Sequence, residues 1–231
     1  IEENQPRWLA FLNAEHDLVD EIPYDMANLI VPNGKLAPNL VKRGIKMDRD
    51  YRASVDMALF NMEHPLVGGY TPDKVALRRA IGLAYDMPNE IRLVRKGQSI
   101  PSQSPVSPLT YGYDPNFKSE MGEYNPAQAK ALLDAFGYVD RDGDGWRELP
   151  DGTPMTLEMA TEPDQLARQR DEIWRKSMTA VNIRIVFKPA KWPENLKSVR
   201  TGKFMVWRVA SSAAAPDGQP SFDKAATIHK G

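Results

Sequence analysis

Residues 155–209 read MTLEMATEPDQLARQRDEIWRKSMTAVNIRIVFKPAKWPENLKSVRTGKFMVWRV, and this stretch decides the fold. Apolar and polar side chains alternate from Met155 to Met159 and again from Ile183 to Phe187, which predicts two strands. A helix with one apolar face is predicted between them, over about 162–180. The remaining segments are a short helix over 192–200 and a third strand from Phe204 to Val209. The order β-α-β-α-β predicts right-handed crossovers and a mainly parallel sheet.

Such a sheet also predicts where a ligand binds. Ligands of open α/β sheets lie beyond the carboxyl ends of the strands. The third strand is expected to end near Val209, so residues 210–217 lie where a solute is expected. The candidate substrate-binding residues are Ala210, Ser211, Ser212, Ala213, Ala214 and Asp217.

The chain before this stretch predicts further helices and one strand. Thr71 and Pro72 are good residues for a helix start, and Leu77, Ala80, Ile81 and Ala84 follow as an apolar stripe. Asn125-Pro126 opens another helix, with Gln128 placed for a capping box. The other expected elements are a helix over 6–14, two strand candidates around Tyr51 within 45–61, and a long loop over 97–118 that is either functional or a surface segment.

Composition and motifs exclude several classes of protein. Thirty basic and thirty-one acidic residues give a net charge of −1, so no basic excess would attract nucleic acid. The chain has no cysteine, which excludes thiolate metal sites and cysteine nucleophiles. A phosphate loop, a dinucleotide fingerprint and the Gly-x-Ser-x-Gly elbow are absent, and no run of about 18 apolar residues predicts a membrane span. The sequence therefore gives no support for an enzyme of these classes.

An acidic segment offers the one candidate metal site. Residues 140–151, DRDGDGWRELPD, match the spacing of a calcium loop, with Gly145 at the position of the sharp turn. The candidate ligands are Asp140, Asp142, Asp144, Trp146 and Asp151. Position 12 is Asp instead of the longer Glu, and a strand instead of a helix follows. The alternative is a polar turn that holds no ion, and both interpretations stay open.

Several segments together resemble a family of bacterial extracellular solute-binding proteins, that of the peptide and nickel ABC transporters. The helix from Leu77 to Asp86, LRRAIGLAYD, is similar to the most recognisable helix of that family. The run from Tyr124 to Asp134, followed by Phe136-Gly-Tyr138, resembles the helix before its Asp-Gly-Asp-Gly turn. Weaker similarities are the run from Arg7 to Val19 and Leu59-Phe-Asn-Met62, and the matches follow the order of the family.

The resemblance implies a periplasmic-binding-protein-like fold and half of a binding site. Family members are about twice this length and fold as two lobes, so residues 1–231 are expected to be a single lobe, the second, without an internal domain boundary. The ligand-facing family motif Gly-Trp-x-Ala-Asp-Tyr-Pro-Asp aligns with residues 210–217. In peptide binders its first Asp pairs with the amino terminus of the ligand, and Ala214 stands there in this chain. The resemblance therefore puts a peptide with a free amine in doubt, since a buried ammonium would lack its counter-charge.

The expected function is that of a substrate-binding component of an ABC uptake transporter. The lobe would contribute half of an interlobe cleft for a peptide-like or other small solute and would act with a membrane permease. The expected location is the periplasm, or the outside of a Gram-positive cell with a membrane anchor. No cofactor is expected apart from the candidate calcium ion. The alternative is a calcium-stabilised binding module with no role in transport.

Overall fold

The computed structural model describes residues 4–213 and 216–217 of the chain. It divides into two compact units: the chain up to Asp50 together with Ile91–Ile100, and Tyr51–Glu90 together with the chain from Pro101 onward. The expectation of a single lobe over residues 1–231 stays a prediction. Among the described helices, none has both the length and the apolar character that crossing a membrane requires.

The first unit is small and helical. Its core is formed by Trp8, Ile30, Ala37 and Leu40. The strand candidate before Tyr51 is wrong, because residues 45–50 have no regular secondary structure, and Ile45 packs against the helical core of this unit instead. The helical elements of the unit are α1 (Asn4–Leu12), η1 (Tyr24–Met26), α2 (Ala27–Ile30), η2 (Pro32–Gly34) and α3 (Pro38–Lys42).

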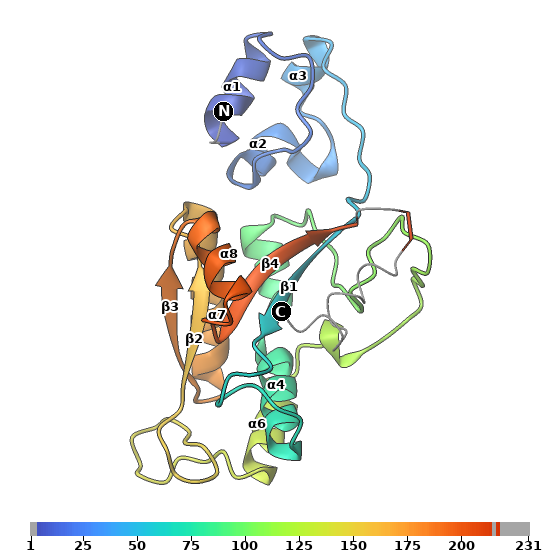
Figure 1. Ribbon diagram of the computed structural model, residues 1–231. Coiled ribbons are helices and arrows are strands. Elements are labelled where there is room, and N and C mark those ends of the chain that lie inside the picture. The colour runs from blue at the N-terminus through green and yellow to red at the C-terminus, as the bar shows by residue number, and fades with distance from the viewer. Residues whose placement is uncertain (1–3, 214–215, 218–231) are drawn as a thin grey trace. The chain divides into compact units, whose positions relative to one another are not determined.

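The second unit is built on a four-stranded sheet with the order β1-β4-β2-β3 (Figure 1). The strands are β1 (Ser54–Phe60), β2 (Thr156–Thr161), β3 (Arg184–Pro189) and β4 (Val206–Ser212). β2 pairs in parallel with both β3 and β4, whereas β1 pairs with β4 in the antiparallel direction. The predicted α/β fold with a mainly parallel β-α-β-α-β sheet is thus confirmed, with β1 as an added antiparallel edge.

Four longer helices accompany the sheet, and the sequence predicted each of them. They are α4 (Pro72–Ala84), α6 (Pro126–Ala135), α7 (Gln165–Ala180) and α8 (Trp192–Arg200). The Asn125 side chain caps α6, accepting a hydrogen bond from the Gln128 backbone N–H at 3.0 Å. The other half of the predicted capping box is absent, because the Asn125 backbone N–H donates to the Leu83 carbonyl at 2.8 Å. The short helical turns are α5 (Met87–Asn89), the π-helix η3 (Glu90–Val94) and η4 (Glu120–Gly122).

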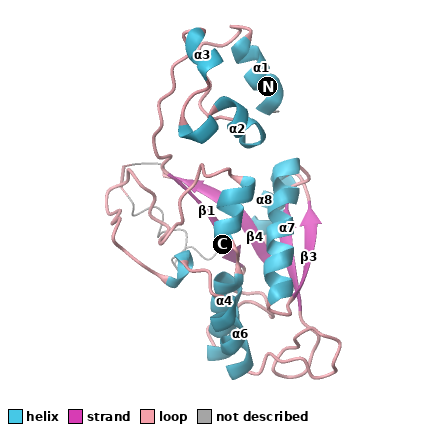
Figure 2. Ribbon diagram, turned by 180° about the vertical axis from the view of Figure 1, so that it is seen from behind, coloured by secondary structure: helices cyan, strands magenta, loops and turns pink. Residues whose placement is uncertain are grey.

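The helices cover the two faces of the sheet unequally. Leu77 of α4, Leu133 of α6 and Trp174 of α7 share one core with Met159 and Val206 of the sheet. α8 lies on the opposite face, where the ring of Trp192 meets that of Trp207 with centroids 5.4 Å apart. Figure 1 shows α8 in front of the sheet, and the reverse view in Figure 2 shows α7 in front of it. The core is therefore concentrated on the α4, α6 and α7 side.

Candidate functional site

The carboxyl ends of β2, β3 and β4 share one edge of the sheet, because parallel strands point the same way. The sequence placed the end of β4 near Val209, and this prediction is wrong by three residues. β4 continues to Ser212 because β1 pairs with it along its whole length. Ala210 lies opposite Asp56, Ser211 opposite Val55 and Ser212 opposite Ser54. Three predicted binding residues thus belong to the strand and not to a loop after it.

The predicted segment lies at the surface where the structure describes it. Ala210, Ser212 and Asp217 are exposed, and Ser211 and Ala213 are half-buried. The Ala213 N–H donates to the Ala53 carbonyl at 2.8 Å, which continues the pairing by one residue. Ala214 lies outside the described residues. The end of β4 therefore presents a small, uncharged surface that no described helix covers at Ala210 and Ser212.

The predicted long loop reaches this segment. Its Tyr111 N–H donates to the Pro216 carbonyl, and Tyr111 forms an isolated parallel bridge with Asp217. The Tyr111 side chain is 83% exposed, so it is one of the large apolar groups open to solvent beside the segment. The structure supports the surface-segment interpretation of this loop and adds an aromatic residue to the candidate site.

Arg208 of β4 forms a buried ion pair with Glu90. Arg208 Nη2 donates to Glu90 Oε1 at 2.6 Å and lies 3.8 Å from the Asp56 carboxylate. The side chains of Arg208 and Glu90 are only 14% and 6% exposed. The Tyr85 hydroxyl donates to the other oxygen of Glu90. These residues were not predicted; an arginine inside the apolar run of β4 was the one signal available.

Two carboxyl groups near the end of β2 have raised pKa values. Asp171 of α7 accepts hydrogen bonds from the Thr161 hydroxyl at 3.0 and 3.1 Å, and burial raises the pKa of its carboxyl group. Burial, with the nearby charge of Asp164 as the second cause, also raises the pKa of Glu162. Burial therefore raises the pKa of both carboxyl groups at this edge of the sheet, consistent with its partial exclusion of water.

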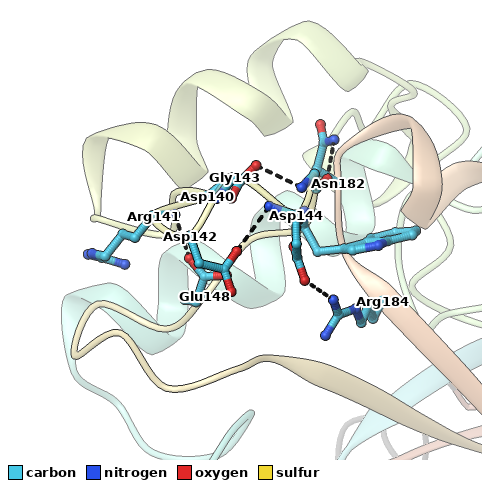
Figure 3. Close-up of polar contacts among 10 residues, drawn as sticks. Asp140, Arg141, Asp142, Gly143, Asp144, Glu148, Asn182 and Arg184 are labelled. Carbon is cyan, nitrogen blue, oxygen red and sulfur yellow. Dashed lines mark hydrogen bonds and ion pairs between the residues drawn. The ribbon is translucent and has the colours of Figure 1, made fainter.

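The acidic loop is a separate cluster, drawn in Figure 3. Oxygens of Asp140, Asp142, Asp144 and Glu148 all lie within 4.8 Å of one another. Asp140 accepts from the Gly143 and Gly145 N–H groups at 2.8 and 2.9 Å, as expected for a tight polar turn. Figure 3 shows Asp142 beside Glu148, with Asp144 turned to Arg184, which donates to it. The loop has the geometry of a cation site and also the internal bonds of a turn.

The two remaining predicted ligands are Trp146 and Asp151. Trp146 donates its N–H to Asp144 Oδ1 at 2.9 Å, and Arg184 lies over its ring at 5.7 Å. Asp151 accepts from the Thr153 N–H at 2.9 Å in its own turn and is not in the described four-carboxylate cluster. Glu148, which stands at position 9 of the calcium-loop spacing, belongs to the cluster, whereas Asp151 at position 12 does not.

Comparisons with known proteins agree on a family. The model of the bacterial extracellular solute-binding proteins, family 5 Middle, matches residues 1–227. The di/tripeptide-binding protein 2 of Pseudomonas aeruginosa is 26% identical over 133 residues, which cover 57% of this chain and 23% of that protein. The matched stretch therefore spans less than a quarter of the length of that relative.

Solved structures show the same fold. The oligopeptide-binding protein AppA from Bacillus subtilis, in complex with a nonapeptide, superposes with a TM-score of 0.74 at 16% identity, covering 93% of this chain and 40% of that one. NikA from Brucella suis, in complex with Fe(III)-EDTA, has a TM-score of 0.74 at 22% identity, with coverages of 96% and 42%. DppA from Helicobacter pylori, in complex with the peptide STSA, has a TM-score of 0.70 at 19% identity, with coverages of 96% and 38%. Since the family model matches nearly the whole sequence, this chain belongs to the bacterial extracellular solute-binding proteins, family 5.

Proposed function

We propose that this chain is part of the substrate-binding component of an ABC uptake transporter and forms half of an interlobe cleft for a peptide-like or other small solute. The observation that carries the proposal is the family match over residues 1–227. The family is one of transport binding proteins, and the proposed role is binding without catalysis. The membrane partner would be the permease of the transporter, and the location the periplasm or, with a membrane anchor, the outside of a Gram-positive cell.

The end of β4 is the part of this chain proposed to contact the solute. Ala210 and Ser212 are exposed at the carboxyl edge of the sheet, where ligands of open α/β sheets bind. Their small side chains leave room beside the strand, and Ser211 and Ser212 carry hydroxyl groups that can donate or accept hydrogen bonds. Asp217 and Ala213 are proposed to flank the same surface. The relatives named above bind or were solved with peptides and a metal chelate, so the proposal covers peptide-like solutes and other small solutes.

Titration calorimetry on the whole protein would test this function. A library of dipeptides to nonapeptides, matched amine-blocked peptides and small chelates is titrated into wild-type protein. We expect at least one solute to bind, and the missing carboxylate at Ala214 predicts that amine-blocked peptides bind at least as well as free ones. Tight binding of free dipeptides alone would contradict this preference.

A pair of variants locates the solute. Ser212→Trp places a bulky ring at the carboxyl end of β4, and Thr201→Trp places the same ring at the C-cap of α8, before β4 begins. We expect Ser212→Trp to weaken binding by about tenfold or more and Thr201→Trp to change it by less than about twofold, where tenfold corresponds to about 1.4 kcal/mol. Equal affinities for the two variants would place the solute elsewhere.

Calcium binding is the second candidate, favoured by the four carboxylates that converge within 4.8 Å. A site with a Kd one hundred times below the calcium concentration would stabilise the fold by about 2.7 kcal/mol. The test compares the melting temperature in millimolar calcium, in magnesium and in chelator. Asp142→Asn removes one carboxylate charge and is expected to abolish any calcium-dependent rise. An equal melting temperature in calcium and in chelator would exclude the calcium site and favour the interpretation as a polar turn that holds no ion.

A further inference from the structure

We propose that Arg208 is a positioning residue that holds the solute-facing half of β4 in place through Glu90 and Asp56. The inference rests on the proposed function, because it assigns the end of β4 to the solute. It concerns how that end is held and not what the solute is. Arg208 acts through the strand and is not assigned a contact with the solute.

The sheet opens between β2 and β4 at the level of Arg208. The described ladder between these strands contains two pairs, Met159 with Val206 and Ala160 with Trp207. From Arg208 to Ser212, β4 continues beside β1, with Ala58 opposite Arg208. Figure 1 shows β1 and β4 running together away from β2 at this end. The half of β4 proposed to meet the solute is therefore held by a neighbouring strand on one side, so its position depends on other contacts.

Arg208 supplies those contacts at the point of separation. Successive side chains of a strand point to opposite faces, so Arg208 lies on the same face as Val206, toward the core. Its Nη2 atom reaches Glu90 at 2.6 Å and Asp56 of β1 at 3.8 Å. One guanidinium group thus ties β4 to its partner strand and to the segment that follows α5.

Glu90 is itself fixed from two directions. Its backbone N–H donates to the Asp86 carbonyl at 3.1 Å, and its carboxylate accepts from the Tyr85 hydroxyl. The Tyr85 ring stacks on Trp174 of α7, with centroids 4.2 Å apart and an interplanar angle of 26°. The anchor for Arg208 therefore leads back into the hydrophobic core and does not depend on the exposed loops.

The energetics favour a positioning role over a stabilising one. Removing two charged groups from water is unfavourable, and a buried ion pair often adds little net stability over apolar residues of similar size. Nη1 of Arg208 is also buried without a hydrogen-bond partner among the described residues, which adds to that penalty. A pair of this kind fixes the position of β4, because its short, directional hydrogen bonds form in only one arrangement of the strand.

The test uses the whole protein and separates stability from positioning. The double variant Glu90→Leu/Arg208→Met replaces the pair with apolar side chains and should keep or raise the melting temperature. Amide hydrogen exchange is then followed in Val209–Ser212, with β2 as the internal reference. We expect exchange in Val209–Ser212 to become about tenfold faster and solute affinity to fall about tenfold, with β2 unchanged. Arg208→Lys, which keeps the charge but not the planar fork, should recover part of both effects.

A matched exposed pair serves as the control. Arg79 and Glu120 also form a 2.6 Å ion pair, but their side chains are 49% and 40% exposed. Arg79→Met should leave exchange in β4 and solute affinity unchanged. A folded double variant with wild-type exchange and affinity would overturn the proposal, and so would faster exchange with wild-type affinity. If the wild-type protein bound no solute, the proposed function would fail, and the exchange rates alone would decide whether Arg208 orders β4.

Discussion

We expect the stability of the fold to depend strongly on Arg147, a buried side chain in the loop before β2, and Arg147→Met tests this. Its side chain is 8% exposed, with Nε donating to the Val181 carbonyl at 2.8 Å and Nη1 to the Tyr138 carbonyl. Val181 and Tyr138 are fully buried, so water cannot replace the lost donors. Hydrogen bonds to a charged group contribute about 1.5–3 kcal/mol each, and Met restores part of the packing. We expect a loss of about 3–5 kcal/mol, a large share of the 5–15 kcal/mol typical of a domain.

Urea unfolding monitored by tryptophan fluorescence measures this loss. The midpoint should fall while the slope stays constant, because the surface exposed on unfolding is unchanged. Arg147→Lys keeps the charge and loses the fork, so its midpoint should lie between those of wild type and Arg147→Met. Arg79→Met removes an exposed pair and should change stability by less than about 1 kcal/mol. If Arg147→Met changed stability no more than Arg79→Met, the reasoning from buried carbonyls would be refuted.

Two further predictions concern packing and pH. A Cβ atom at Gly68 would lie 2.3 Å from the Met62 carbonyl oxygen, so Gly68→Ala should lower the free energy of unfolding by about 1–3 kcal/mol or more. Gly82 of α4 has open space around it, so Gly82→Ala should raise the free energy of unfolding by about 0.5–1 kcal/mol. Urea unfolding checks both, because the two variants should shift the midpoint in opposite directions. Because burial raises the pKa of Asp171, the folded state binds the proton of this carboxyl group more tightly than the unfolded state does. The wild-type protein therefore loses stability as the pH rises from the ordinary pKa of an aspartate through the raised pKa of Asp171. Asp171→Asn should remove that loss, so the melting temperature of wild type relative to the variant should be highest at the acidic end of a series between pH 3 and 7. A difference in melting temperature that does not vary with pH would contradict this.

The elements of the sheet were predictable because their signals are local. Apolar and polar side chains alternate over Met155–Met159 and Ile183–Phe187, and this alternation predicted β2 and β3. The helix between the two strands predicted that they pair in parallel. The end of β4 was missed because Ala210, Ser211 and Ser212 are small and carry no apolar alternation. What extends the strand is β1, whose position beside β4 no local pattern contains.

The candidate site was predictable only in part, for the same reason. The carboxyl edge follows from topology, and the acidic loop follows from spacing, so both appear in the sequence. The Arg208–Glu90 pair joins residues 118 positions apart, and a single sequence offers no signal that these two meet. Asp151 was expected as a ligand from the same spacing, but its carboxylate accepts from the Thr153 N–H in its own turn.

The order β1-β4-β2-β3 has a consequence for how the sheet folds. The last described strand lies between the first and the second, and Ser54 meets Ser212 across a separation of 158 residues. Until β4 is in place, β1 therefore lacks its described partner strand and β2 lacks one of its two. Contacts of such long range slow folding and expose strands that can pair with other chains. A chain arrested before Val206 would leave edges of β1 and β2 that other strands can pair with.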